Sequence, residues 1–393
     1  MAFLHGVEVI EIDAGPRPIQ TVKSSVIGIV GTAPDADAAA FPLNTPVLVA
    51  GSRKEAANLD TTGDRKGSLP NALDGIFDQI GAVVVVVRVE EGADEAETLA
   101  NVIGGVNAGD GNFEGVHALL GAESVVGVSP RILIAPGFTH QRPGGLANPV
   151  VAELQGIANR LRAVVIADGP NTTDAAAITS AGDFGSDRIY LCDPWHKVMV
   201  GATVVDVPPS SRVAGLIAKT DNDTGFWASP SNTLISGIIG LSRPVDFKLG
   251  DANCRANLLN EAKVATTIRQ NGFRLWGNRS LTDDTKWTFL CVRRTADIIN
   301  DSLLRAHLWA VDRGITKTYQ EDVSEAVNAF LRDLVSLGAI LGGKCWPDPD
   351  LNSPANIQLG KVFFNFDFTP IYPAEHITFR SHLVNDYIEE VFT

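Results

Sequence analysis

The chain has 393 residues, of which 45% are hydrophobic and 20% are charged, and its formal net charge is −14. This composition is typical of a folded protein with two or three domains and a sizeable core. An acidic chain is a poor general binder of nucleic acid, because neutralising phosphates requires clustered Lys and Arg. The longest apolar run, Ala82–Val87, is far too short to cross a membrane. We therefore expect neither direct nucleic-acid binding nor membrane insertion.

At the N-terminus, HGVEVIEIDAG (residues 5–15) alternates like a strand, with Val7 and Val9 on one side and Ile10 and Ile12 on the other. The segment Gly15–Pro18 then breaks the pattern. This predicts a short β-arm ahead of the main fold. Such a strand must pair with another strand, since its backbone groups are otherwise left without partners.

Six apolar runs recur between residues 23 and 200, and they are nearly continuous rather than alternating. This is typical of parallel strands buried on both faces. The runs are residues 24–31, 46–51, 82–89, 131–137, 163–169 and 188–193.

Helical signals lie between these runs. Ser52 to Glu55 forms a capping-box pattern, and Pro70 and Pro149 occupy first-turn positions, the latter after Asn148. Alternation of strands and helices predicts an α/β domain with a largely parallel sheet, which we assign to residues 23–245.

From residue 246 to 372 we expect a second, smaller domain. Residues 254–269 predict a helix that ends before the turn dipeptide Asn271-Gly272. Residues 286–294 predict a strand, and helices are predicted over 294–314 and 315–339. In KVFFNFDFTP, residues 361–370, the side chains of Phe364, Phe366 and Phe368 share one face, which predicts a half-buried strand.

The tail from residue 373 to 393 begins after two prolines, Pro370 and Pro373. Its first part alternates like a strand, whereas Leu383, Tyr387 and Val391 are spaced like a helix. The periodicity leaves both alternatives open for the end of the tail.

The sequence lacks the common motifs of catalysis. It has no GxxxxGK[ST], no GxGxxG after a strand, no GxSxG and no HExxH. Four widely spaced cysteines form no CxxC pair, and the closest two histidines, His376 and His382, are six residues apart. We therefore expect no catalytic residues, no cofactor, no metal and reduced thiols. No secretory signal opens the chain, so cytoplasmic synthesis is expected.

One loop keeps an enzymatic alternative open. Asp168–Asn171 follows a buried strand, and open α/β sheets bind ligands at the carboxyl ends of their strands. Asp and Asn are also ordinary turn formers. An α/β enzyme or ligand-binding protein with its site at this loop is the second hypothesis.

The charge is uneven along the chain. Residues 254–317 hold 11 Lys and Arg against 6 Asp and Glu. A solvated helix face would explain this, and so would a surface complementary to an acidic partner.

Long stretches of the sequence, covering nearly the whole chain, resemble the contractile tail sheath proteins of phages and R-type bacteriocins. They are residues 3–9, 161–174, 220–232 (TDNDTGFWASPSN), 242–281, 309–319 and 347–354. Two of them contain a tryptophan among polar turn residues. The resemblance implies that Trp227 and Trp276 are structural anchors rather than catalytic groups.

The resemblance further implies a structural subunit that forms six-fold rings stacked helically around a tail tube. The sheath contracts from a metastable extended state and drives the tube through a bacterial envelope. The implied partners are other copies of the chain, the tail tube protein, and baseplate and tail terminator proteins. The implied location is a virion tail or bacteriocin particle that is assembled in the host cytoplasm.

Residue roles also follow from the resemblance. The outer α/β domain would be inserted into a smaller, tube-facing core, with arms at 1–22 and 373–393. Each arm would add a strand to a neighbouring subunit: Phe3–Asp13 at the N-terminus and Ile377–Val391 at the C-terminus. The C-terminal arm carries the apolar residues Ile377, Phe379 and Leu383. The strand that receives an arm would be Lys361–Phe368. The resemblance also implies that the core contacts the tail tube, partly through charge. The residues predicted to do so lie on the first predicted helix of the core: Arg255, Lys263 and Arg269.

Overall fold

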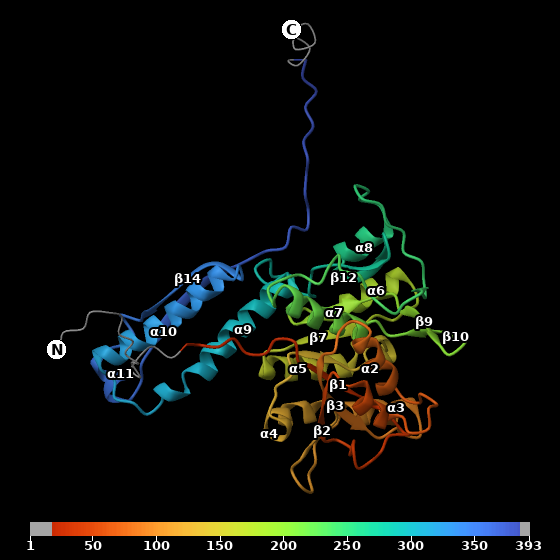
Figure 1. Cartoon of the computed structure of the whole chain (residues 1–393), viewed down its shortest axis with the longest axis horizontal. Coiled ribbons are helices and arrows are strands. Elements are labelled where there is room, and N and C mark those ends of the chain that lie inside the picture. The colour runs from red at the N-terminus through yellow and green to blue at the C-terminus, as the bar shows by residue number, and fades with distance from the viewer. Residues whose placement is uncertain (1–17, 386–393) are drawn as a thin grey trace, which may run out of the picture.

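A computed structural model describes residues 18–385 (Figure 1). Its larger part is an eight-stranded sheet in the order β13-β12-β8-β7-β6-β1-β3-β2, and all neighbouring strands are parallel except β2–β3 and β12–β13. The predicted α/β fold and all six apolar strands are confirmed. The strands are β1 (Ile27–Thr32), β2 (Pro46–Ala50), β3 (Val83–Val89), β6 (Ile132–Ile134), β7 (Val164–Asp168), β8 (Ile189–Cys192), β12 (Val264–Arg269) and β13 (Phe273–Trp276).

Successive residues of the central strands point to opposite faces of the sheet, so both faces are apolar. Ile27 and Ile29 lie in one core and Val26 and Val30 in the other. One face is covered by α2 (Leu69–Phe77) and α7 (Ser210–Asp223). The other packs against α3 (Glu95–Ile103), the 3-10 helix η2 (Gly115–Gly121) and α5 (Pro149–Leu161).

The predicted helix starts are confirmed by their caps. Ser52 accepts a hydrogen bond from the backbone N–H of Glu55, and Asn148 accepts one from Val151. The shorter helices of this part are α1 (Arg53–Ala56), η1 (Ala57–Leu59), α4 (Ala122–Val126), η3 (Pro143–Gly145), α6 (Asp174–Ala181) and α8 (Arg255–Glu261). Two small sheets consist of β9 (His196–Val200), β10 (Thr203–Val207) and β11 (Gly240–Leu241), and of β4 (Gly105–Val106) and β5 (Phe113–Glu114).

The predicted helix over residues 254–269 is wrong in its second half. Helix α8 ends at Glu261, and the chain returns to the large sheet as β12, which pairs with β8 and with β13. Four of the six residues of β12 are β-branched, which favours a strand. Asn271 and Gly272, both with positive φ, form the hairpin turn between β12 and β13. The predicted domain boundary at 245/246 therefore falls before two strands of the large sheet.

The predicted strand over residues 286–294 is also wrong, because α9 (Leu290–Ala306) begins inside it. The remaining elements form a smaller α+β part: the 3-10 helix η4 (Leu308–Ala310), α10 (Lys317–Ser336), β14 (Ile340–Pro347), α11 (Pro354–Gln358) and β15 (Phe364–Pro370). Its core includes Ile299 of α9, Phe330 of α10 and Ile340 of β14, with Phe226 contributed from the α/β part. The predicted helix over 315–339 and the strand over 361–370 are confirmed.

Helix α9 lies between the two parts of the molecule (Figure 1), and charged side chains connect it to the larger part. Arg188, at the start of β8, donates two hydrogen bonds to Asp297 of α9, at 2.5 and 2.9 Å. Arg294 binds Asp221 of α7 through both of its terminal nitrogens, at 2.7 and 2.5 Å, and only 4% and 2% of these two side chains is exposed. Arg131 pairs with Asp301 on the same helix. Each charge is buried together with its partner.

We expect the substitution Arg294→Met to destabilise the protein by about 3–5 kcal/mol, because it leaves the Asp221 carboxylate buried without a partner. The double variant Arg294→Met/Asp221→Leu should recover most of this loss, since neither charge then remains. Thermal unfolding followed by circular dichroism checks both. As a control, Lys317→Met removes a side chain that is 89% exposed and should change stability by less than about 0.5 kcal/mol. Equal effects of the single and double variants would contradict the prediction.

Candidate functional site

The antiparallel pair β14–β15 forms a separate two-stranded sheet. Two strands alone are marginally stable and leave one free edge on each strand. On β14 this edge is partly covered: Asn328 of α10 accepts a hydrogen bond from the backbone N–H of Cys345, at 2.8 Å, and donates one to its carbonyl, at 3.0 Å. A side chain thus replaces a neighbouring strand at this position.

The outer edge of β15 has no strand partner among residues 18–385. Cys345 is opposite Phe366 in the register, and its backbone groups point away from β15 toward Asn328. Opposite residues in an antiparallel pair alternate between hydrogen-bonded and non-hydrogen-bonded pairs. The backbone N–H and C=O of Phe364, Phe366 and Phe368 therefore point to the open edge. Their rings pack on the core of the smaller part.

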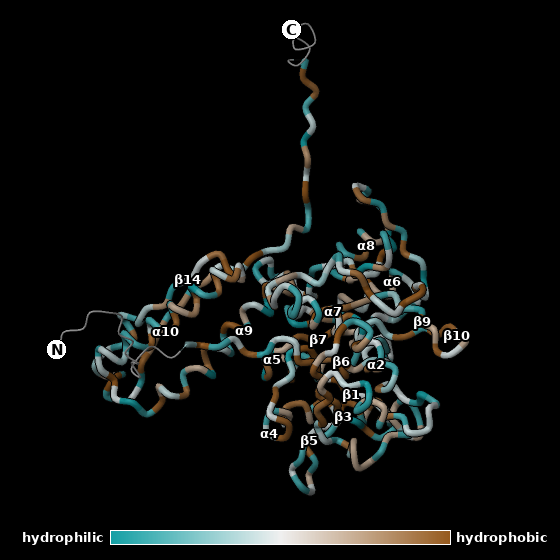
Figure 2. Tube along the Cα trace, viewed as in Figure 1, coloured by the Kyte–Doolittle hydropathy of each residue, from teal (hydrophilic) through white to brown (hydrophobic). Residues whose placement is uncertain are grey.

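After β15 the chain leaves the body as an extended segment, residues 371–385, without regular secondary structure (Figure 1). Hydrophobic residues recur along it (Figure 2), and the exposed fractions of Ile377, Phe379 and Leu383 are 66%, 92% and 99%. The alternatives of strand and helix beyond residue 385 lie outside the described residues. The exposed apolar side chains have the features of a segment that packs on another chain.

Val7, Val9, Ile10 and Ile12 of the predicted N-terminal arm lie outside the described residues. The chain that follows them lies along α9. The backbone N–H of Val22 donates to the hydroxyl of Ser302, at 3.1 Å, and Arg294 donates to the carbonyl of Ser24, at 3.2 Å.

The two tryptophan turns lie against each other and hold the hairpin β12–β13. The Ser231 hydroxyl accepts from the backbone N–H of Gly277, at 3.0 Å, and Ser229 donates to Asn278. Trp227 contacts the ring of Phe226 edge-on and packs on the smaller part, whereas Trp276 contacts Phe247 beside α8. Both rings are half-buried and fill gaps between elements.

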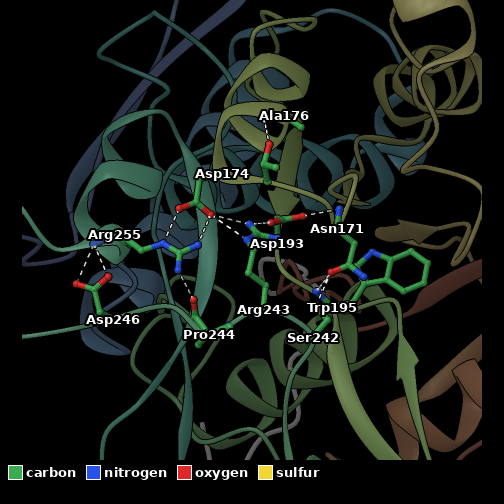
Figure 3. Close-up of polar contacts among 11 residues, drawn as sticks. Asn171, Asp174, Ala176, Asp193, Trp195, Ser242, Arg243, Pro244, Asp246 and Arg255 are labelled. Carbon is green, nitrogen blue, oxygen red and sulfur yellow. Dashed lines mark hydrogen bonds and ion pairs between the residues drawn. The ribbon is translucent and has the colours of Figure 1, made fainter.

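The loop Asp168–Asn171, where an enzyme would place its site, is saturated by internal hydrogen bonds. Asp168 is fully buried and accepts from the backbone N–H and hydroxyl of Ser210, at 2.8 and 2.9 Å, and from the hydroxyl of Thr139, at 3.0 Å. Burial nevertheless raises the pKa of this carboxyl to about 6. Asn171 accepts from the backbone N–H of Trp195 and from Ser242, as Figure 3 shows. These side chains tie β7, β8 and α7 together through their hydrogen bonds.

The three predicted tube-facing residues do not share a helix. Arg255 begins α8 but binds Asp174, with Nε 2.7 Å from Oδ2, next to Arg243 (Figure 3). Lys263 follows α8 and pairs with Asp283. Arg269 ends β12 and lies over the ring of Phe273, 5.7 Å from its centroid. Arg255 and Lys263 are thus neutralised within the chain, which explains part of the basic stretch as internal ion pairs.

A cavity lies elsewhere, between α2 and β9. Its volume is about 210 Å³, and Arg53, Asp74 and Arg212 line it. No group of three or more His, Cys, Asp or Glu side chains in residues 18–385 could hold a metal ion. None of the helices in this range combines the length and apolar character that crossing a bilayer requires.

Two features of the site could not be predicted from the sequence. Asn328 looks like any polar residue of an amphipathic helix, and its pairing with Cys345 depends on how α10 packs against β14. Arg279, in the second tryptophan turn, binds Glu375 across 96 residues of sequence, and no periodicity connects them.

Comparison with known proteins gives family matches along most of the chain. Residues 111–281 match the phage tail sheath protein central domain, residues 282–383 match the phage tail sheath C-terminal domain, and residues 24–89 match the N-terminal region of domain III of tail sheath protein Gp18.

Similar proteins include a prophage major tail sheath protein of Pseudomonas aeruginosa, 45% identical over all of this chain and 99% of the relative. The tail sheath protein of Escherichia phage P2 is 35% identical, with 100% and 98% of the two chains covered. Among solved structures, the PVC sheath complex of an extracellular contractile injection system, in its contracted state, has a TM-score of 0.71 at 17% identity, covering 98% and 99% of the chains. The contracted helical sheath of the anti-feeding prophage has a TM-score of 0.71 at 20% identity, covering 97% and 99%. The fold is therefore shared with these sheaths.

The raised pKa of Asp168 predicts a pH-dependent stability. The folded protein holds this proton more tightly than the unfolded chain, whose carboxyl has the ordinary value of 3.8. The stabilisation is complete below pH 3.8 and is lost as the pH rises through about 6. It amounts to ~3 kcal/mol for a difference of about two pH units. Between about pH 4 and pH 7, the free energy of unfolding of the wild type should fall by this amount relative to that of Asp168→Asn, and urea unfolding measures both. A constant difference across the range would contradict it.

Proposed function

The chain belongs to the phage tail sheath family and is a structural subunit of a contractile sheath, and we propose that its copies form six-fold rings stacked helically around a tail tube. The observation that supports this proposal is that one chain contains both an open sheet edge and an exposed apolar segment. Among residues 18–385, no strand pairs with the outer edge of β15, and the side chains of segment 376–385 are exposed.

The two features fit each other by β-strand addition, in which an extended segment supplies backbone hydrogen bonds to an open sheet edge. Because Asn328 covers the edge of β14, the incoming strand adds to β15, next to Phe364, Phe366 and Phe368. The alternating apolar residues of the arm, Ile377 and Phe379, then pack beside these rings. The N-terminal arm, Phe3–Asp13, is proposed to add to the same sheet.

A sheath linked in this way can contract without dissociating. The strand pairings persist while the segments between arm and body change direction. The ion pairs of α9 hold each subunit together during this movement. We propose that the energy is stored in the assembly, and that the subunit consumes no nucleotide and catalyses no reaction.

The remaining partners follow from the same proposal. The subunit would contact a tail tube protein on the inside and baseplate and tail terminator proteins at the ends, in a virion tail or bacteriocin particle assembled in the host cytoplasm. Contact of Arg255, Lys263 and Arg269 with the tube stays a prediction. The internal pairing of the first two makes Arg269, which is exposed, the strongest of the three.

Electron microscopy of the concentrated full-length protein, alone and with its cognate tube protein, tests the proposal. Hollow striated tubes with six-fold symmetry are expected, and a chain that ends at Glu375 should form none, because it lacks the arm. Small discrete particles under every condition would contradict the sheath assembly.

A sharper variant pair tests the receiving edge. Phe366→Pro removes a backbone N–H that points to the open edge, without removing a hydrogen bond of the β14–β15 pair. Phe366→Ala loses the same ring but keeps the N–H. Both subunits should fold with similar melting temperatures, and the proline variant alone should fail to form tubes. If both variants assemble equally well, the incoming strand does not pair along this edge.

A further inference from the structure

The first residues of the C-terminal arm are attached to the body at two points. The ring of Tyr372 contacts that of Phe289, with centroids 6.2 Å apart. Three residues later, the carboxylate of Glu375 accepts two hydrogen bonds at 3.0 Å from Nε of Arg279 and one at 2.5 Å from Nη2. Residues 376–385 are all exposed as well, and the side-chain hydrogen bond found among them, between Thr378 and His376, stays within the arm.

Arg279 is itself held in a rigid position by the second tryptophan turn. The backbone N–H of Leu290, the first residue of α9, donates to the carbonyl of Asn278, at 3.0 Å, and Arg279 forms a β-bridge with Phe289. Gly277 has a φ of 149°, and a Cβ atom there would lie 2.8 Å from Cα of Ala265 on β12. The turn is therefore pressed against the large sheet on one side and against the start of α9 on the other.

We propose that Arg279 and Glu375 form a clasp that fixes the direction in which the C-terminal arm leaves the subunit, and that the arm bends after Glu375 instead of at Pro370–Pro373. This inference rests on the proposed function, because the direction of the arm matters only if a neighbour must receive it. Pro370 ends a paired strand and Tyr372 and Glu375 are attached to the body, so the prolines belong to the rigid part.

The chemistry of the pair suits a directional contact. A guanidinium that binds a carboxylate through two nitrogens fixes orientation as well as distance, which an ammonium cannot do. The side chains are 41% and 30% exposed, so water and salt screen the pair. Loss of the pair should therefore raise the subunit concentration that assembly requires by about two- to fivefold.

The first test measures the arm in the isolated subunit and does not depend on assembly. Spin labels are attached to cysteines introduced at Lys286 and at His376, which directly follows Glu375. Both positions are exposed, whereas the four native cysteines are buried and react slowly. Electron–electron double resonance then gives the distribution of distances between body and arm. Glu375→Gln should broaden this distribution and Arg279→Glu/Glu375→Arg should narrow it again. An unchanged distribution in Glu375→Gln overturns the clasp.

The second test measures assembly by sedimentation and electron microscopy at low and high salt. Glu375→Gln and Arg279→Lys should need about two- to fivefold more subunit than wild type at low salt, with a smaller difference at high salt. The control Asp64→Asn removes an exposed carboxylate that pairs with Lys66 in the α/β part and should behave as wild type. Normal assembly of Glu375→Gln overturns the inference. Failure of wild type to assemble overturns the proposed function instead, while the distance measurement still decides the clasp.

Discussion

The organisation of this subunit depends on burying charge in pairs along α9. An isolated buried charge is unstable, whereas a hydrogen-bonded pair is tolerated, so each arginine and aspartate of the array requires its partner in position. Arg294 with Asp221 and Arg188 with Asp297 connect a helix of the smaller part to α7 and β8 of the large sheet. The two parts are thereby joined with defined geometry. The position of β14, β15 and the segment that follows them relative to the large sheet depends on this joint.

The features that could be predicted from the sequence are those with a strong local signal. Continuous apolar runs gave six strands of the large sheet, and side-chain caps at Ser52 and Asn148 marked two helix starts. The segment 254–269 could not be predicted correctly, because helical spacing of its apolar residues competed with the β-branched content of its second half. Pairing with β8, whose paired residues are 73 positions earlier in the chain, decides in favour of the strand.

The candidate site was predictable only in part, for a related reason. Alternation of Phe364, Phe366 and Phe368 is local, so the strand and its buried face could be recognised. Which edge of the two-stranded sheet is the more open depends on Asn328, and where the arm is attached depends on Arg279. Both are single side chains that meet their partners only after the helices have packed. The single helix predicted for Arg255, Lys263 and Arg269 was wrong because β12 replaces its second half. In addition, no local signal revealed the ion pairs of Arg255 and Lys263.

The side chain of Asn328 has a consequence for polymer order. A two-stranded sheet open on both sides could recruit strands without limit and in either direction, as aggregating edges do. The amide of Asn328 occupies the β14 edge at Cys345, whereas no strand among residues 18–385 pairs with the outer edge of β15, so a further strand is favoured at β15. In the proposed assembly, each junction between subunits would then have a preferred order of strands. A single asparagine would give the proposed mesh a polarity that its backbone hydrogen bonds alone do not provide.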